Sequence, residues 1–415
     1  MILVVKNCSF FIRSLFLLLL CVVAQGCEKS DTFGGYDNGA VLERGDTAAR
    51  TVLVYIMAEN NLADNVASDL NEMRRGTVDI PDSCYLLAFV DDMNKPYICR
   101  FYENKMGDVA CDTVCKFQED FYSTDSAEFK KVLSWVLQEF PSENLGLVMW
   151  SHGNGWLYDA QRNRCIGVDN GKNVYGDILS SSRWMEVEEL AAVLKGLPVK
   201  SDFVLFDACF MQCVEVAYAM REAADWIIGS PAELPGNGAP YDRIMSSMFA
   251  FPFDAKELIE RYKDGYPGIS GVMLSAVNSS AVDRLAEVTA MFIPAYFSSD
   301  LQIDDSDVFS YLSGGYFSPI IQYPEYSDMN GQMMLRLSDE AYLMWKEAFD
   351  AAVPYRIASR KWWSSLNDSV YLVDESQFGG LSMYVPRDNS LYSAFNAYFR
   401  KSEWYQAAGW SGAGW

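Results

Sequence analysis

Histidine is nearly absent from this sequence, because His152 is the only one among 415 residues. Any imidazole acid–base chemistry near neutral pH therefore has to use His152. There is also no Cys-x-x-Cys pair, so the spacings of Cys111 with Cys115 and of Cys209 with Cys213 do not predict zinc. No internal repeat or phosphate-binding glycine loop is present, which argues against a repeat architecture and P-loop nucleotide chemistry.

Basic residues are scarce relative to acidic ones. The chain has 33 Lys and Arg against 56 Asp and Glu, a formal net charge of −23. This becomes −25 if Lys6 and Arg13 are removed with a leader segment. An acidic surface disfavours nucleic acid and anionic lipid heads, so no nucleic-acid partner is expected, and it favours basic peptides or cations. A role in solubility alone is the alternative.

The N-terminus has an apolar run, Ser14 to Val23, that is too short to predict a membrane span with certainty. It follows Lys6 and Arg13 and precedes Ala-Gln-Gly-Cys at residues 24–27, so residues 1–26 resemble a bacterial lipoprotein signal. Cys27 would then be lipidated. Ordinary secretion and a permanent anchor helix are the alternatives.

Residues 27–50 lack apolar periodicity and are expected to form a flexible tether. The sequence thus predicts an exported protein, a lipoprotein anchored to a membrane of the bacterial cell envelope and either exposed at the surface or secreted.

Seven cysteines follow Cys27, an odd number that leaves at least one free thiol or one bond outside the chain. Disulfides among Cys84, Cys99, Cys111 and Cys115 are expected in an exported protein, and their pairing stays open.

The body of the chain alternates apolar runs with amphipathic stretches, which predicts an α/β fold around a mostly parallel sheet. Its length allows one elaborated domain or two. Residues 159–183 have no sustained periodicity and are expected to form a long exposed insertion. Strands are expected at 51–58, 84–91, 97–102, 145–151, 202–207, 226–230 and 379–386, and helices at 63–75, 126–140, 186–197, 215–224 and 338–352.

Two expected strands end just before His152 and Cys209. The carboxyl ends of parallel strands form the ligand crevice of an open sheet, so the two side chains are expected to face one cleft if the strands are neighbours. A thiol beside an imidazole is the minimum set for covalent acyl transfer. The alternative for Cys209 is a buried apolar cysteine.

The sequences Trp-Ser-His-Gly-Asn-Gly-Trp at 150–156 and Leu-Phe-Asp-Ala-Cys-Phe-Met at 205–211 resemble the two catalytic blocks of the clostripain family of cysteine peptidases. The resemblance extends from about residue 52 to 410 and includes 214–218, 230–241, 273–277 and 404–410. Ala239 is a departure, since relatives often have Trp there.

The resemblance implies a caspase-like α/β/α sandwich with C-terminal elaborations, a peptidase domain over 51–390 and a segment packed on it over 391–415. It implies an endopeptidase that cleaves after Arg or Lys with a dyad of His152 and Cys209. Asp207 matches the acidic residue of the specificity pocket, where a buried carboxylate would pair with a basic side chain; capping of the next helix is the alternative.

For the oxyanion we expect the backbone N–H groups of Gly153 and Cys209, because a glycine allows close approach of the backbone to substrate. Glu233 is expected to add negative charge near the pocket.

The chemistry itself is expected to need no cofactor. The resemblance to some relatives implies that calcium binds. Asp91, Asp92 and the turn around Asp169 offer oxygen ligands, but the sequence has no EF-hand spacing that would assign them.

The resemblance also implies self-activation by cleavage between the blocks, where Arg162, Arg164, Lys172 and Arg183 are available. Two rival functions stay open: a non-catalytic surface lipoprotein that binds basic peptides or glycans, and a cysteine hydrolase of small amides.

Overall fold

The computed structural model describes residues 27–28, 43–104, 106–156, 158–159, 162–163, 165–171, 181–268, 270–301, 304–312, 326–365 and 368–415. The expected signal region over 1–26 and most of the expected tether lie outside these residues. Within them, no helix combines the length and the apolar character that crossing a membrane requires.

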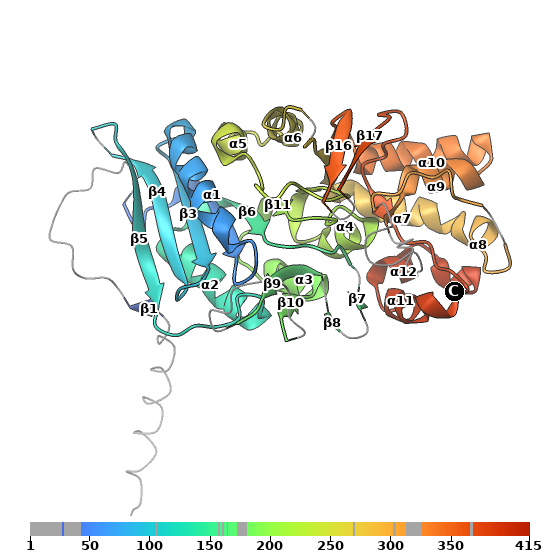
Figure 1. Cartoon of the computed structure of the whole chain (residues 1–415), viewed down its shortest axis with the longest axis horizontal. Coiled ribbons are helices and arrows are strands. Elements are labelled where there is room, and N and C mark those ends of the chain that lie inside the picture. The colour runs from blue at the N-terminus through green and yellow to red at the C-terminus, as the bar shows by residue number, and fades with distance from the viewer. Residues whose placement is uncertain are drawn as a thin grey trace, which may run out of the picture.

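A ten-stranded sheet organises the chain, in the order β1-β5-β4-β3-β2-β6-β11-β12-β13-β15 (Figure 1). Its central strands β3, β2, β6, β11 and β12 run parallel, whereas the pairings toward both edges are antiparallel. In sheet order, the strands are β1 (Cys27–Glu28), β5 (Val109–Phe117), β4 (Tyr97–Glu103), β3 (Cys84–Asp91), β2 (Ala48–Met57), β6 (Ser142–Trp150), β11 (Ser201–Asp207), β12 (Ala224–Gly229), β13 (Met273–Asn278) and β15 (Tyr355–Ala358).

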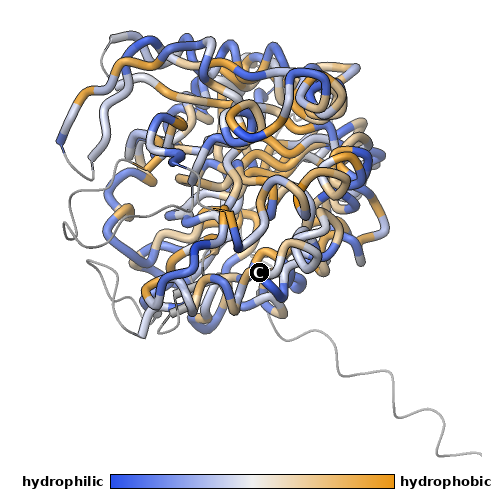
Figure 2. The backbone as a smooth tube through the Cα atoms, turned by 90° about the vertical axis from the view of Figure 1, so that its right-hand side faces the viewer, coloured by the Kyte–Doolittle hydropathy of each residue, from blue (hydrophilic) through white to orange (hydrophobic). Residues whose placement is uncertain are grey.

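Helices cover both faces of this sheet, which confirms the α/β/α sandwich. Alternate residues of β2 enter different cores: Val52, Val54 and Ile56 pack on one side, and Leu53 and Tyr55 on the other. Apolar residues therefore fill the interior and polar residues lie outside (Figure 2). The first core is closed by α1 (Ala63–Gly76), α5 (Tyr241–Met248) and α6 (Ala255–Asp264), and the second by α2 (Ser126–Glu139), α3 (Val187–Lys195), α4 (Val214–Met220), α7 (Val282–Ala290) and α10 (Asp339–Ala352).

The central strands are apolar along almost their whole length because both of their faces are buried. β3 occupies the residues expected for it, and β2 begins at Ala48, ahead of the expected domain start at 51.

The C-terminal part differs from expectation in one strand. Instead of a strand over 379–386, only β18 (Ser382–Met383) forms, and it pairs with β14 (Ser327–Asp328) in a separate small sheet. The reason is that β15 already occupies the edge of the main sheet next to β13.

The last residues pack on the domain through α11 (Ser393–Phe399) and α12 (Glu403–Ala407), which bury Phe399 and Trp404.

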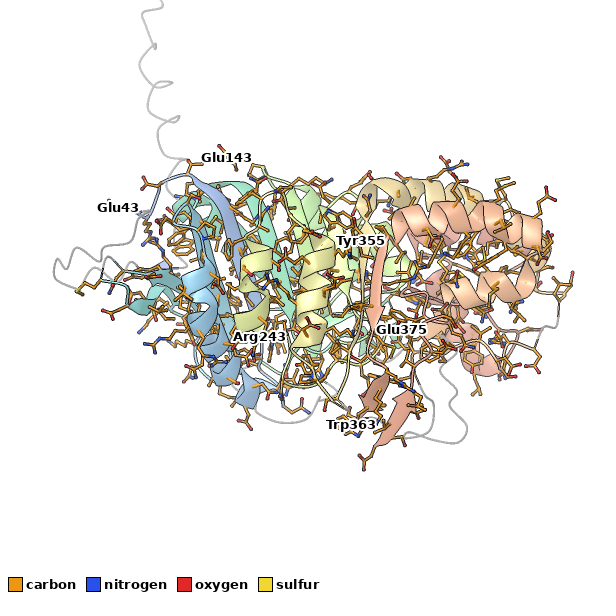
Figure 3. All side chains as sticks on the ribbon, turned by 90° about the horizontal axis from the view of Figure 1, so that it is seen from above. Glu43, Glu143, Arg243, Tyr355, Trp363 and Glu375 are labelled. Carbon is orange, nitrogen blue, oxygen red and sulfur yellow. The ribbon has the colours of Figure 1, made fainter. Side chains whose placement is uncertain are left out.

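A hairpin of β16 (Lys361–Ser364) and β17 (Ser369–Leu372) stands out from the body near Trp363 (Figure 3). Its other tryptophan, Trp362, is buried and donates from Nε1 to the carbonyl of Glu233 at 3.3 Å. The hairpin therefore packs on the loop after β12.

The expectation of an exposed insertion over 159–183 is wrong for its middle part. Residues 165–171 are buried, and β9 (Ile166–Asp169) pairs with β10 (Arg183–Met185). Gly167 N donates to the carbonyl of His152, and Asn154 N to that of Cys165, each at 2.9 Å. The insertion thus folds back against the histidine loop. Two short strands, β7 (Tyr158–Asp159) and β8 (Arg162–Asn163), precede it.

The expected disulfides among the first four cysteines of the domain are not formed with one another. Cys84, Cys99 and Cys111 carry free thiols, whereas Cys115 is disulfide-bonded. Cys84 and Cys99 lie buried within strands, where Cys99 donates to the carbonyl of Ala88 at 3.7 Å. Packing in the sheet accounts for these two residues.

Candidate active site

β6 and β11 are neighbours, and their register pairs Trp150 with Asp207. The two strands therefore end side by side, and the loops that carry His152 and Cys209 leave the same edge of the sheet. The condition for a shared cleft, that the two strands are neighbours, is therefore met.

Gly153 is a point of close contact between these loops. A Cβ atom added there would lie 2.5 Å from the carbonyl oxygen of Cys209 and 2.9 Å from Cβ of Ala208. Gly153 bridges to Ile166, but the ladder bonds come from Asn154 N and Gly167 N. The N–H of Gly153 is therefore not used by this ladder.

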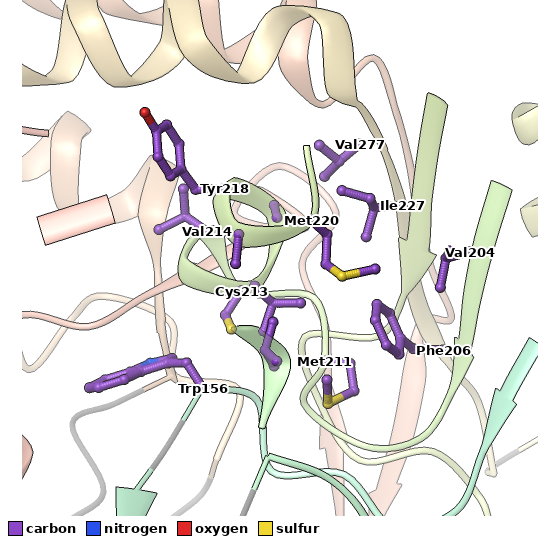
Figure 4. Packing of buried hydrophobic residues seen from close by; sticks show 14 of the residues in the cluster. Trp156, Val204, Phe206, Met211, Cys213, Val214, Tyr218, Met220, Ile227 and Val277 are labelled. Atoms are coloured by element: carbon purple, nitrogen blue, oxygen red, sulfur yellow. The ribbon is translucent and has the colours of Figure 1, made fainter. Parts of the chain in front are cut away.

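The loop after β11 holds Cys209 in a constrained turn. Phe210 has a φ of +61°, a left-handed conformation that a non-glycine residue adopts at a cost, and its N–H donates to Ala232 O at 3.0 Å. Met211 and Cys213 enter the core beside Phe206, where they anchor the loop (Figure 4). Burial of the residues that follow Cys209 therefore stabilises the strained backbone at Phe210.

The sulfur of Cys209 faces the loop after β12. Its Sγ accepts from Leu234 N at 3.3 Å and lies 3.8 Å from Leu234 O. Burial, followed by the charges of Glu233 and Asp207, raises the pKa of the Cys209 thiol to about 12. The resting sulfur is therefore a neutral thiol at pH 7.

His152 is held by a residue that the sequence analysis did not select. Its Nε2 lies 2.7 Å from Oδ1 of Asn61, which follows β2 on the neighbouring strand. An amide oxygen only accepts hydrogen bonds, so Nε2 carries the hydrogen and Nδ1 is left for proton exchange with substrate or thiol. The Asn-rich turn after the first strand was the available signal, but a turn asparagine has many other roles.

Burial lowers the pKa of His152 to about 4. His152 and Cys209 are thus both neutral at rest and do not form an ion pair.

We expect replacement of Asn61 by Ala to lower kcat by about 100-fold, because the imidazole loses the contact that orients it. KM and the unfolding midpoint are expected to stay near those of the parent protein. Asn61→Asp keeps an acceptor oxygen, so it should restore much of kcat, and its charge should move the acid limb of the pH profile upward. Asn61 does not position the histidine if Asn61→Ala raises KM by as large a factor as it lowers kcat. The same conclusion follows if the pH profile of Asn61→Asp is unshifted.

Asp207 lies buried behind the cysteine. Its Oδ2 accepts from Ala239 N at 2.8 Å and from the hydroxyl of Tyr241 at 2.9 Å, and Oδ1 accepts from the hydroxyl of Tyr262 at 3.1 Å. Burial raises its pKa, and these donors lower it in part. Asp207 does not cap α4, which begins at Val214 with Cys213 before it.

A second carboxylate that the sequence analysis missed lies beside Asp207. Asp69 on α1 is fully buried, accepts from Trp150 Nε1 at 2.7 Å through Oδ2, and has no hydrogen-bond partner at Oδ1. A Cβ added to Gly238 would lie 2.8 Å from Asp207 Oδ2 and 3.4 Å from Asp69 Oδ2. Both carboxylates therefore lie close to Gly238 and to each other.

The carboxylate of Glu233 is hydrogen-bonded to the hairpin of β16 and β17. Its Oε1 accepts from the N–H of Ser365 at 3.1 Å and from the hydroxyl of Ser365 at 2.6 Å, and its Oε2 accepts from Ser364. The side chain is buried, so its observed contacts attach β16 to the loop beside Cys209.

Two of the four candidate cleavage positions, Arg162 and Arg183, lie among the described residues. Arg183 is exposed at the start of β10, with its guanidinium carbon 3.9 Å from the ring centroid of Tyr122, and Arg162 lies in β8. Arg164 and Lys172 lie outside the described residues, as does the side chain of Cys27.

Comparison with known proteins places the chain in a family. The model of the Clostripain family matches residues 54–415. Clostripain of Hathewaya histolytica is 25% identical over 231 residues, which cover 48% of this chain and 42% of that protein. The match thus spans less than half of this curated relative.

Solved structures agree over a longer stretch. A secreted C11 cysteine protease from Bacteroides thetaiotaomicron, in complex with an irreversible peptide inhibitor, is 31% identical with a TM-score of 0.73 and covers 88% of this chain and 99% of its own. An inactive zymogen of a C11 protease from Parabacteroides distasonis is 26% identical with a TM-score of 0.74, at the same coverages. This chain belongs to the clostripain family of cysteine peptidases.

Proposed function

We propose that this chain is an exported endopeptidase that cleaves peptide bonds after Arg or Lys through a dyad of His152 and Cys209. The observation that carries the proposal is the joining of the two catalytic loops at Gly153, beside the buried carboxylates of Asp207 and Asp69. The related Bacteroides protease, described as secreted, was captured with an irreversible peptide inhibitor.

The reaction begins with a neutral pair. As substrate enters, the thiol proton moves to the imidazole of His152 while sulfur attacks the scissile carbonyl. The N–H groups of Gly153 and Cys209 donate to the oxyanion, and His152 then protonates the departing amine. Water hydrolyses the acyl-enzyme with His152 as the base. These steps need no cofactor.

Specificity for a basic side chain follows from the paired carboxylates. Two ionised carboxylates this close would repel each other, and burial together with the charge of Asp207 raises the pKa of Asp69 to about 8. A guanidinium or ammonium group brought against these carboxylates would supply positive charge, and a donor for Oδ1 of Asp69, which has no hydrogen-bond partner. A neutral side chain supplies neither.

The raised pKa of Asp69 predicts how stability depends on pH. Folded Asp69 keeps its proton between about pH 4 and pH 8, where the unfolded carboxyl has lost it, so the contribution of this group declines as pH rises through that window. Asp69→Asn cannot titrate. We therefore expect its free energy of unfolding to fall less between pH 5 and pH 8 than that of the parent protein. Urea unfolding at both pH values measures this difference, and equal declines would contradict the raised pKa.

Self-activation is part of the proposal, since a related structure is described as an inactive zymogen. Cleavage after Arg162, Arg164, Lys172 or Arg183 would separate the two catalytic blocks. Intact-mass measurement of active protein and of Cys209→Ala tests it: two fragments are expected from the first and one chain from the second. One intact chain in a fully active sample would refute self-activation.

A lipid anchor on Cys27 is proposed from the resemblance of residues 24–27 to a lipoprotein signal. Expression of the full chain and of Cys27→Ser in a bacterial host, followed by detergent phase partition, tests it. The parent is expected in the detergent phase and the variant in the aqueous phase; parent protein in the aqueous phase would favour ordinary secretion.

The peptidase proposal is tested with fluorogenic peptides that end in Arg, Lys, Asp or a neutral residue. Cleavage after Arg or Lys, lost in Cys209→Ala and His152→Ala, is expected. No cleavage of any peptide, together with binding of basic peptides, would favour the non-catalytic lipoprotein. Hydrolysis of small amides but not of peptides would favour the small-amide hydrolase.

A further inference from the structure

The peptide group that joins Glu233 to Leu234 is hydrogen-bonded at both ends. Its N–H donates to Sγ of Cys209 at 3.3 Å, and its carbonyl oxygen accepts from Nε1 of Trp362, also at 3.3 Å. This peptide bond is trans, so its N–H and C=O lie in one plane, point in opposite directions and cannot turn independently. The bond from Trp362 therefore fixes the direction of the N–H that meets the sulfur.

The hairpin of β16 and β17 holds Trp362 and Glu233 firmly. Trp362 is buried and pairs with Tyr371 across the hairpin, with 5.4 Å between the ring centroids. The carboxylate of Glu233 accepts from Ser364 and Ser365, which follow Trp362 in the chain. Backbone and side chain of Glu233 are thus bound to the same short stretch of the hairpin.

The sulfur of Cys209 needs such a donor because it becomes an anion in a buried place. Burial raises the pKa of the Cys209 thiol to about 12, and the hydrogen bond from Leu234 lowers it in part. A donor binds a charged acceptor more strongly than a neutral one, so the Leu234 N–H favours the thiolate over the thiol. This help depends on alignment, since hydrogen bonds weaken steeply as the donor turns away.

We propose that Trp362 is a positioning residue for the nucleophile, because it keeps the Leu234 N–H directed at Sγ of Cys209. The inference rests on the proposed role of Cys209. Trp362 binds only the peptide group and acts on the sulfur through it. Hydrogen bonds in such a chain also polarise one another, which strengthens the donor at the sulfur end. The carboxylate of Glu233 then serves the nucleophile by anchoring the same peptide group.

The test compares Trp362→Phe with Trp363→Phe in the purified full chain. The first variant keeps an aromatic ring but removes the N–H that binds the carbonyl of Glu233. The second makes the same change one residue along β16, on the part of the hairpin that stands out from the body, where Nε1 donates to Asp368 at 3.1 Å (Figure 3). Iodoacetamide is the probe, and peptide mass spectrometry follows its rate of reaction at each cysteine.

Cys111 is the internal reference, because it is an exposed free thiol on β5. We expect Trp362→Phe to lower the rate of alkylation of Cys209 at pH 8 about 3-fold or more, since less thiolate forms when the donor is not held. The rate at Cys111 should not change. The rate profile of Cys209 should move to higher pH, and kcat should fall by at least the same factor with KM near that of the parent. Trp363→Phe should match the parent in every readout.

An unchanged rate at Cys209 in folded Trp362→Phe would overturn the proposal, even with a lower unfolding midpoint, because the tryptophan would then contribute to stability alone. An equal loss in Trp363→Phe would also overturn it. If Trp362→Phe does not fold, Ser364→Ala takes its place, since it removes a donor to the carboxylate of Glu233. It should also slow the alkylation of Cys209, and an unchanged rate would again contradict the proposal.

Alkylation by iodoacetamide needs no peptide substrate. Failure of the peptidase proposal would therefore appear as absent cleavage with the difference in alkylation rate intact. Failure of the present proposal would appear as cleavage with equal alkylation rates at Cys209 in the parent and in Trp362→Phe.

Discussion

Asp207→Asn is expected to lower kcat/KM for Arg and Lys peptides by roughly 30-fold or more, the equivalent of about 2 kcal/mol. The substitution removes one of the two carboxylates that would meet the basic side chain, while Asp69 is mostly protonated at pH 7 because burial and the charge of Asp207 raise its pKa to about 8. The small activity toward peptides with neutral side chains should change little. Steady-state kinetics on matched peptides measures the ratio.

The control for this change is Asp242→Asn, at a partly exposed carboxylate in the first turn of α5 that pairs with Arg75 at 3.0 Å. It should keep the preference for Arg and Lys. Because Asp207→Asn would place an amide group among three hydrogen-bond donors, the unfolding midpoint of both variants must be compared with the parent. An unchanged preference in a folded Asp207→Asn protein would remove Asp207 from the pocket.

Gly153→Ala is expected to lower kcat by about 100-fold. The new methyl would lie 2.5 Å from the carbonyl oxygen of Cys209, and neither that oxygen nor Cβ of Ala208 can rotate away. The histidine and cysteine loops must therefore separate, and a displacement of about 1 Å of a reacting group costs on this order. Stopped-flow or steady-state assays of the purified variant provide the measurement.

Gly236→Ala is the matched control, because its added Cβ would meet nothing closer than 3.9 Å in a loop on the same side of the sheet. It should keep nearly full activity. Equal activity of both variants would mean that the contact at Gly153 does not hold the catalytic loops together.

The parallel core was predictable from the sequence because apolar runs that end sharply at polar residues have few interpretations other than buried parallel strands. β3 matches its predicted range, and β11 begins one residue before its own. The departure of the His152 and Cys209 loops from neighbouring strands was expected from strand order and from the resemblance to a family. Both depend on local patterns that sequence displays directly.

The missed features depend on contacts between distant segments. β9 has only four residues, too few to show a periodic pattern in the sequence. It includes Gly167, which has a φ of +78° and lies close to the side chain of Met57. Asp69 lies on an amphipathic helix, where a carboxylate suggests a solvated face, yet it is buried next to Gly238 and Trp150.

The carboxylates of Glu59, Asp91 and Asp169 are buried together, with one oxygen of each within 4.8 Å of the other two, and this clustering has the same origin. Asp91 and the turn at Asp169 were recognised as oxygen sources, but Glu59 joins them only through the folding of β9 against the end of β2. Sequence spacing carries no trace of that contact.

The central claim is that Cys209 is the nucleophile of a peptidase selective for basic residues, and covalent labelling tests it most directly. The protein is incubated with peptide chloromethyl ketones ending in Arg or in Leu, and the labelled residue is identified by peptide mass spectrometry. We expect one adduct, on Cys209, from the Arg reagent at a much higher rate than from the Leu reagent. Labelling of another residue, or equal rates for both reagents, would contradict it.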